Sequence, residues 1–145
     1  MKCENIFLEK LDSVIQKYKL KYIDVSKDSA FLIGNEFVLI LTIHFDHMYV
    51  EYVYRDSNDN LISYNITSYI VSKFDSKDRE NIGNPQNVSE TLIAIFTIWS
   101  KGLPRHWSQL LSGDKDWLKS YNQFELSSKP KKVIPEYESI LKKYI

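Results

Sequence analysis

The chain has 145 residues, of which 43% are hydrophobic, so it can bury one sizeable core and is predicted to form a single globular domain over residues 1–145. Its 19 basic and 19 acidic residues leave no net charge, which argues against nonspecific binding of nucleic acid. Cys3 is the only cysteine, and this excludes an intramolecular disulfide.

The amino end has the wrong composition for a signal peptide. It carries charges where an unbroken apolar run would be needed: Glu4, Glu9, Lys10 and Asp12. The longest apolar run, residues 37–43, is far shorter than the ~20 residues that cross a bilayer. Together with the single cysteine, these features predict a cytoplasmic protein with no membrane partner.

The first half of the chain predicts one helix followed by strands. Apolar residues recur at helical spacing from Phe7 to Tyr18, which indicates an amphipathic helix over about residues 3–19. Five short segments that are apolar or rich in aromatic and β-branched residues follow at 21–25, 30–33, 36–44, 48–55 and 61–66. Residues 36–44 are apolar on both alternations, as in a central strand covered on both faces. We therefore predict an antiparallel meander of three to five strands.

The second half is predicted to be helical, which makes the fold class α+β. Residues 67–74 favour a short helix over a further strand, and residues 75–86 predict an exposed loop. Asn87 is suited to cap the next helix, with Glu90 as its reciprocal partner. Because that helix is apolar nearly all round, we expect four of its side chains to be almost fully buried: Leu92, Ile95, Phe96 and Trp99.

Glycine and proline divide the rest of the chain. Gly102 and Pro104 are expected to interrupt the buried helix, and helical spacing resumes from residue 105 to residue 111. Gly113 is placed as a helix stop, and Asp114 as the cap of a helix over residues 115–121. Residues 127–132 predict a polar linker, after which Pro135 begins a last helix.

His44, Asp46 and His47 form the cluster best suited to bind a metal ion. Zinc would need a fourth ligand from elsewhere, and no second pair of residues with ligand spacing exists. We therefore predict a polar hairpin end with no metal and no cofactor. His106 beside Arg105 could bind an anion, but the commoner outcome is an exposed pair next to a buried tryptophan.

The common catalytic signatures are absent from the sequence. It contains no G-x-S-x-G, G-x-x-x-x-G-K-[ST], G-x-G-x-x-G or H-E-x-x-H pattern. Cys3 is poorly placed for a nucleophile, since a reactive thiolate needs a base beside it in a fixed pocket. We predict a protein that is not an enzyme.

Tyrosines and acidic residues are concentrated along the predicted meander. Aromatic rings can anchor a protein interface and carboxylates can select a basic partner. The candidate partner-binding residues are Asp46, Tyr49, Glu51, Tyr54, Asp56 and Asp59. The alternative is ordinary strand composition, with the tyrosines half buried under helices.

An amino-terminal helix, a meander and a helical carboxyl half with H-W-S-Q-L-L-S-G-D-K-D-W at residues 106–117 resemble small bacterial immunity-type proteins. The resemblance implies a cytoplasmic, non-catalytic inhibitor whose partner is a protein such as a basic toxin domain, and it assigns no contact residue. One alternative is a small enzyme or ligand-binding domain that uses a pocket between meander and helices, with residues 44–47 as its polar centre. Another is a nucleic-acid-linked regulator that uses the lysine-rich residues 129–143.

Overall fold

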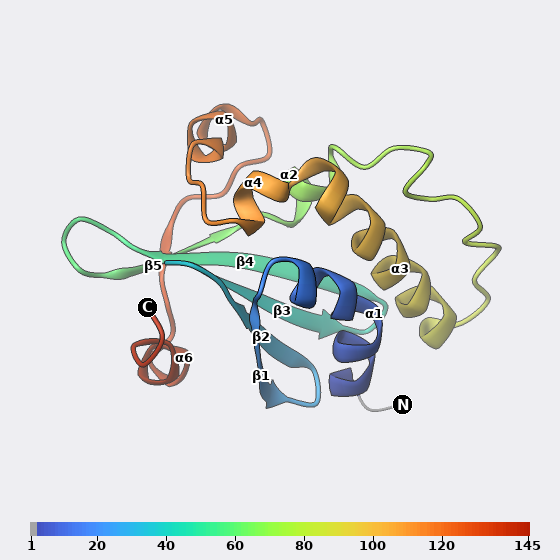
Figure 1. Ribbon diagram of the computed structural model, residues 1–145, viewed down its shortest axis with the longest axis horizontal. Helices are drawn as coiled ribbons and strands as arrows, with labels where there is room; N and C mark the ends of the chain where they lie inside the picture. The colour runs from blue at the N-terminus through green and yellow to red at the C-terminus, as the bar shows by residue number, and fades with distance from the viewer. Residues whose placement is uncertain (1–2) are drawn as a thin grey trace.

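A computed structural model describes residues 3–145 of the chain. Figure 1 shows the helices and strands in their order along the chain. They are α1 (Cys3–Lys17), β1 (Lys21–Ser26), β2 (Ser29–Ile33), β3 (Val38–His44), β4 (His47–Arg55), β5 (Leu61–Asn65), α2 (Thr67–Val71), α3 (Val88–His106), α4 (Ser108–Leu111), α5 (Trp117–Gln123), β6 (Lys131–Lys132) and α6 (Pro135–Leu141).

The strands form one antiparallel sheet in the order β1-β2-β3-β4-β5-β6. The predicted α+β class is confirmed, and the sheet has one strand more than predicted. That strand, β6, lies in residues 127–132, where we expected a polar linker, and it pairs with Ile62 and Ser63 of β5. The cause is the next residue, Val133, which is buried and whose amide donates to the Leu61 carbonyl, so the segment is held at the sheet edge.

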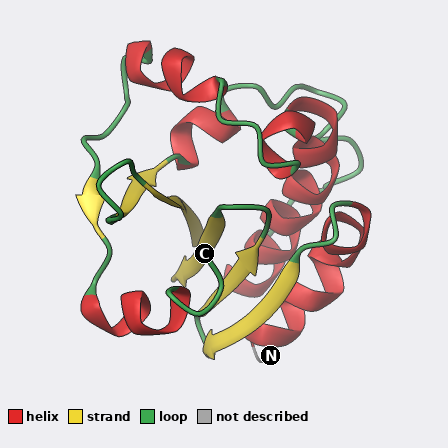
Figure 2. Cartoon of the chain, turned by 60° about the vertical axis from the view of Figure 1, so that its left-hand side comes forward, coloured by secondary structure: helices red, strands yellow, loops and turns green. Residues whose placement is uncertain are grey.

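Both faces of the sheet are covered by helices. Because successive side chains of a strand point to opposite faces, each central strand contributes to two hydrophobic clusters. Figure 2 shows α6 on one side of the sheet and the larger group of helices on the other. The sheet side chains under this larger group are chiefly Ala30, Leu32, Leu39, Leu41, Ile43, Met48, Val50, Tyr52 and Tyr64. Those on the α6 side are Phe31, Ile33, Val38, Ile40, Val53 and Leu61. The two-sided burial of β3 confirms the prediction for a central strand.

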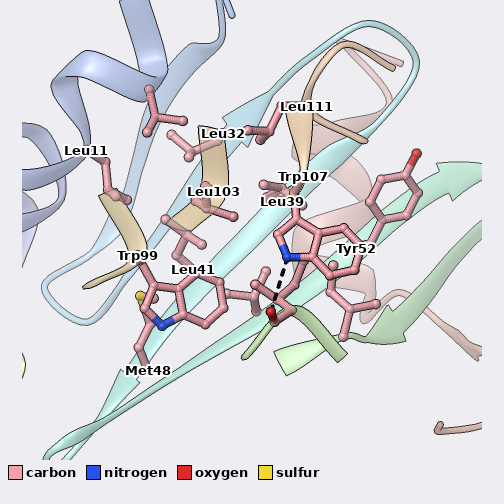
Figure 3. Packing of buried hydrophobic residues seen from close by; sticks show 14 of the residues in the cluster. Leu11, Leu32, Leu39, Leu41, Met48, Tyr52, Trp99, Leu103, Trp107 and Leu111 are labelled. Atoms are coloured by element: carbon pink, nitrogen blue, oxygen red, sulfur yellow. Dashed lines mark hydrogen bonds between the residues drawn. The ribbon is translucent and has the colours of Figure 1, made fainter. Parts of the chain in front are cut away.

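Large aromatic side chains join the helices to the sheet. Phe7 of α1 meets Phe96 of α3 edge to face, with ring centres 5.4 Å apart. Trp99 and Trp107 lie over the strands among leucines, and the Trp107 indole N–H donates to the Ile70 carbonyl at 3.1 Å (Figure 3). This bond satisfies a polar atom that would otherwise be buried without a partner.

Helix α3 corrects two predictions. It continues through Gly102 and Pro104, which we expected to interrupt it, and ends at His106. Pro104 lies in the last turn, where one main-chain hydrogen bond is lost and the packing of neighbouring residues offsets the loss. Gly102 allows close packing, because a Cβ there would meet the Phe74 ring at 2.3 Å.

The expected burial of α3 is only half correct. Phe96 and Trp99 are buried, but Leu92 and Ile95 are half exposed, since the sheet and α1 cover only part of the helix surface. The side chain of Asn87 caps the helix by accepting from the Glu90 amide at 2.9 Å, as predicted. The Glu90 carboxylate does not return this bond to Asn87 and accepts instead from the Gln86 amide.

The chain after α3 turns at Gly113. This glycine has a left-handed backbone (φ 99°), and its amide donates to Leu110 while the Asp114 amide donates to Gln109, which ends α4 as predicted. Asp114 accepts from the Asp116 amide at 2.8 Å, so it organises the turn before α5. That helix begins two residues later than expected.

Candidate functional site: the hairpin tip

The most unusual surface feature is the connection between β3 and β4. The strands pair up to His44 and His47, so Phe45 and Asp46 form a two-residue turn. We call residues 44–47 the hairpin tip. Phe45 has a left-handed backbone with φ 57°. Asp46 does not share this positive φ, and two-residue turns of this pattern favour glycine at the first position, so a bulky aromatic residue there is strained.

The Phe45 side chain does not contribute to either core. It is 76% exposed, and its ring contacts that of His44, with centres 4.5 Å apart. Tyr49 is 40% exposed, and its ring centre lies 6.2 Å from that of His47. The Asp46 carboxylate lies 3.3 Å from Nε2 of His47. The tip is therefore an exposed aromatic group with a carboxylate beside it.

The six partner-binding residues predicted from the sequence do not form one surface. Asp46 belongs to the tip, and Tyr49 and Glu51 follow it along β4 on the α6 side of the sheet. Tyr54 lies on the opposite side, where its ring stacks on that of Tyr64 with centres 6.2 Å apart.

Asp56 and Asp59 lie beyond the other end of β4. With nine residues at ~3.3 Å each, that end is roughly 30 Å from the tip. Asp56 accepts from the Asn58 and Asn60 amides, and Asp59 pairs with Arg55 at 3.1 Å. Both carboxylates therefore organise their own turn.

Most tyrosines of the meander belong to the core. Tyr52, Tyr64 and Tyr69 are all buried under the helices. Burial raises the pKa of Tyr64 to about 12, and Tyr54 beside it adds to the effect. Burial also raises the pKa of Tyr52, whose hydroxyl has no hydrogen-bond partner among the described residues. The alternative of ordinary strand composition therefore describes these three residues.

A charged cluster that the sequence analysis missed joins the loop after α2 to the end of α3. Asp78 is completely buried, although residues 75–86 were predicted to be an exposed loop. One of its oxygens accepts from Nη1 of Arg105 at 2.5 Å, and the other lies 2.9 Å from Nε2 of His106. Arg105 also binds Asp75, at 2.8 Å. We call Asp75, Asp78, Arg105 and His106 the Asp78 cluster. The expected exposed pair beside a buried tryptophan is found in part: Arg105 is exposed and Trp107 is buried, but His106 is half-buried and contacts Asp78.

Both carboxyl groups of the Asp78 cluster have pKa values below the ordinary value for aspartate. The Arg105 hydrogen bond lowers the pKa of Asp75 far below its ordinary value. Burial by itself would raise the pKa of Asp78, but hydrogen bonds from the Asp75 amide, Arg105 and His106 outweigh it, so the pKa is lowered. Both carboxylates are thus held in the charged form by groups of the chain itself.

The same cluster has the composition of a metal site but not its free ligands. Within the described part of the chain, one group of at least three candidate ligands is close enough to hold an ion, and it is Asp75, Asp78 and His106. However, Asp78 already accepts from three donors, and the Arg105 cation lies between the two carboxylates. The arrangement fits a structural link between loop and helix.

The centre of the interface between meander and helices is filled by side chains. A void of only about 10 Å³ remains there, among residues such as Leu39, Val50 and Leu103. A larger cavity of about 810 Å³ lies elsewhere, between the β2–β3 turn and the last residues. Its cations face nearby oxygens, since Arg55 donates to Ile145 and Lys115 lies 3.9 Å from Glu36. The hairpin tip lines neither of these spaces, but its His47 lines a smaller groove of about 240 Å³ where β4, α2 and α3 meet.

The lysine-rich end is not a single basic surface. Lys131 and Lys132 belong to β6 at the sheet edge, and Lys142, directly after α6, pairs with Glu138 at 2.8 Å.

Comparison with known proteins gave no matching family model, no similar curated protein and no similar solved structure. None of the helices described here combines the length and apolar character needed to cross a membrane.

Proposed function

We propose that this protein is a protein-binding inhibitor of the immunity type and that its partner docks on the hairpin tip. The observation that carries the proposal is Phe45, which is 76% exposed and left-handed in its backbone. An exposed ring adds little to folding, and strained backbones of this kind cost about 1 to 3 kcal/mol. A residue that lowers stability in this way is expected where it serves binding.

The chemistry of the tip indicates what kind of partner fits. An aromatic side chain surrounded by polar groups is typical of an interface anchor that enters an apolar pocket. Asp46 beside it, and Glu51 further along β4, would favour basic residues around that pocket. Tyr49 adds half-exposed aromatic area on the same strand. Of the six candidate residues, Asp46, Tyr49 and Glu51 fit this docking mode, whereas Tyr54, Asp56 and Asp59 lie too far away.

The test is capture of the partner from a lysate of the native host with three forms of the protein. These are the natural sequence, Phe45→Ser and a control, Ile134→Ser. Ile134 is 50% exposed and precedes α6 near the far end of β4, so the control removes exposed apolar area away from the tip. We expect the natural sequence and the control to retain the same protein, and Phe45→Ser to lose it.

Inhibition is then measured on the purified partner. Adding the natural protein should abolish the toxicity or activity of the partner, and Phe45→Ser should require at least about 30-fold more protein, the effect of losing an interface hot spot. Equal affinity of Phe45→Ser and the natural sequence would show that the tip is not the docking site. Binding without inhibition would contradict the inhibitor role.

A further inference from the structure

A small apolar groove lies beside the hairpin tip. It has a volume of about 240 Å³ and is formed where β4, α2 and α3 meet. Its apolar lining comes from Met48, Val71, Phe74, Ile95, Ile98 and Trp99. We call it the Trp99 groove. Its volume is below the 300–1,000 Å³ typical of sites for drug-sized ligands, so it suits a single large side chain.

The groove lining is apolar surface that the fold leaves partly uncovered. Ile95 and Ile98 are half-buried: they pack against the main core but keep part of their surface accessible. Arg79 also lines the groove and is exposed. Within the described residues only its Nη1 donates, to the Phe74 and Asp75 carbonyls, so other guanidinium N–H groups remain able to bind an anion.

We propose that a second copy of this chain fills the Trp99 groove, with Phe45 of each copy inserted into the groove of the other. The two features match in apolar character and in charge. The tip presents an apolar ring followed by the Asp46 carboxylate, and the groove presents apolar walls with the Arg79 cation. His47 belongs to the tip and also lines the groove, so the two adjoin on one molecule.

This placement favours a closed dimer. A two-fold axis between tip and groove allows both insertions at once, as in other isologous dimers. Both tips and both grooves are then occupied, so no third copy can add through them. The inference goes beyond the proposed function, because the same Phe45 would be hidden in the dimer and released when a tighter partner competes. Self-association would then set the concentration of protein that is free to bind.

The first experiment is sedimentation equilibrium over a concentration series with the natural sequence, Phe45→Ser and Ile98→Glu. Ile98 is half exposed, so a glutamate there can reach solvent while it makes the groove unsuitable for a ring. We expect a reversible dimer of the natural sequence and a dissociation constant at least about 30-fold higher for each variant. Thermal unfolding of both variants checks that they remain folded.

Mixing the two variants gives a sharper test. The Phe45→Ser chain keeps its groove and the Ile98→Glu chain keeps its ring, so an equimolar mixture can form one correct insertion. We expect the mixture to associate more tightly than either variant alone. Dimerisation through any other surface would not produce this recovery, and its absence would overturn the proposal.

A charge exchange tests the rim contact. Asp46→Arg and Arg79→Glu should each weaken the dimer by about fivefold, because like charges then meet across the interface. The double variant should recover the original affinity. If the single variants have no effect, or the double variant fails to recover, the proposed pairing of Asp46 with Arg79 is wrong.

Other outcomes separate this inference from the proposed function. A natural sequence that stays monomeric at its highest attainable concentration overturns the dimer, yet Phe45→Ser would still lose the captured partner. A dimer with the expected behaviour whose variants all bind the captured partner equally would instead overturn the proposed function. Ile98→Glu is expected to weaken only self-association.

Discussion

At Phe45 the residue that would best stabilise the fold differs from the residue proposed to bind a partner. Its left-handed backbone suits glycine much better than phenylalanine, and its ring is 76% exposed. We therefore predict that Phe45→Gly stabilises the protein by about 1 kcal/mol, measured by urea unfolding. The same variant should bind neither partner nor second copy. A variant that is clearly less stable than the natural protein would show that the ring contributes to the fold.

Asp78 lies in a loop, but its carboxylate is buried, so removing it is expected to lower the free energy of unfolding. Asp78→Ala leaves Arg105 and His106 without one of their partners, and we predict a loss of about 2 to 3 kcal/mol in the free energy of unfolding. The control is Glu138→Ala, which removes an exposed helical ion pair with Lys142. That loss should be much smaller, because solvent screens an exposed pair. Equal losses would mean that the Asp78 cluster adds no more than a surface pair.

At the scale of elements, α3 is the helix on which the main core depends. Phe96 is completely buried against Phe7 of α1, so Phe96→Ala should cost about 3 to 5 kcal/mol through the cavity it leaves. Leu92 on the same helix is half exposed, and Leu92→Ala should cost markedly less. Denaturant unfolding of both variants gives the comparison. A thermal melt of Phe96→Ala that matches the natural protein would be incompatible with this packing.

Elements with a strong local pattern were predictable from the sequence. The apolar run of β3 on both alternations, the Asn87 cap and the Gly113 stop each depend on neighbouring residues, and the structure has all three. The extent of α3 was not predictable in the same way. Gly102 is a breaker in isolation, but here it accommodates Phe74, which lies 28 positions away in the chain.

The candidate sites were less predictable than the fold, because they depend on pairing and distant contacts. The burial of Asp78 follows from contacts with Arg105 and His106, which a polar loop sequence does not reveal. The role of Phe45 depends on the β3–β4 register, since only exact pairing of His44 with His47 leaves it in a two-residue turn. Phenylalanine at a hairpin position that favours glycine was the available signal.

For the whole molecule, the lowered pKa values of Asp75, Asp78 and Glu138 set the response to acid. A carboxyl group with a lower pKa in the folded state stabilises the fold above its unfolded pKa of about 4. That contribution is lost as the pH falls from the unfolded pKa through the folded pKa, because in this range the unfolded state binds protons that the folded state does not. We predict a free energy of unfolding that decreases steadily below about pH 4.

Asp78→Asn isolates the part of this response that belongs to the Asp78 cluster. The variant should be less stable than the natural protein at pH 7, because the amide lacks the charge that binds Arg105, and its stability should fall less steeply between about pH 4 and pH 2. Urea unfolding at a series of pH values measures both curves. Lys142→Gln, which removes the partner of Glu138 on α6, serves as the control for a shift at an exposed pair. If the two variants flatten the curve equally, acid sensitivity is spread over the surface and does not depend on the link between the α2–α3 loop and the end of α3.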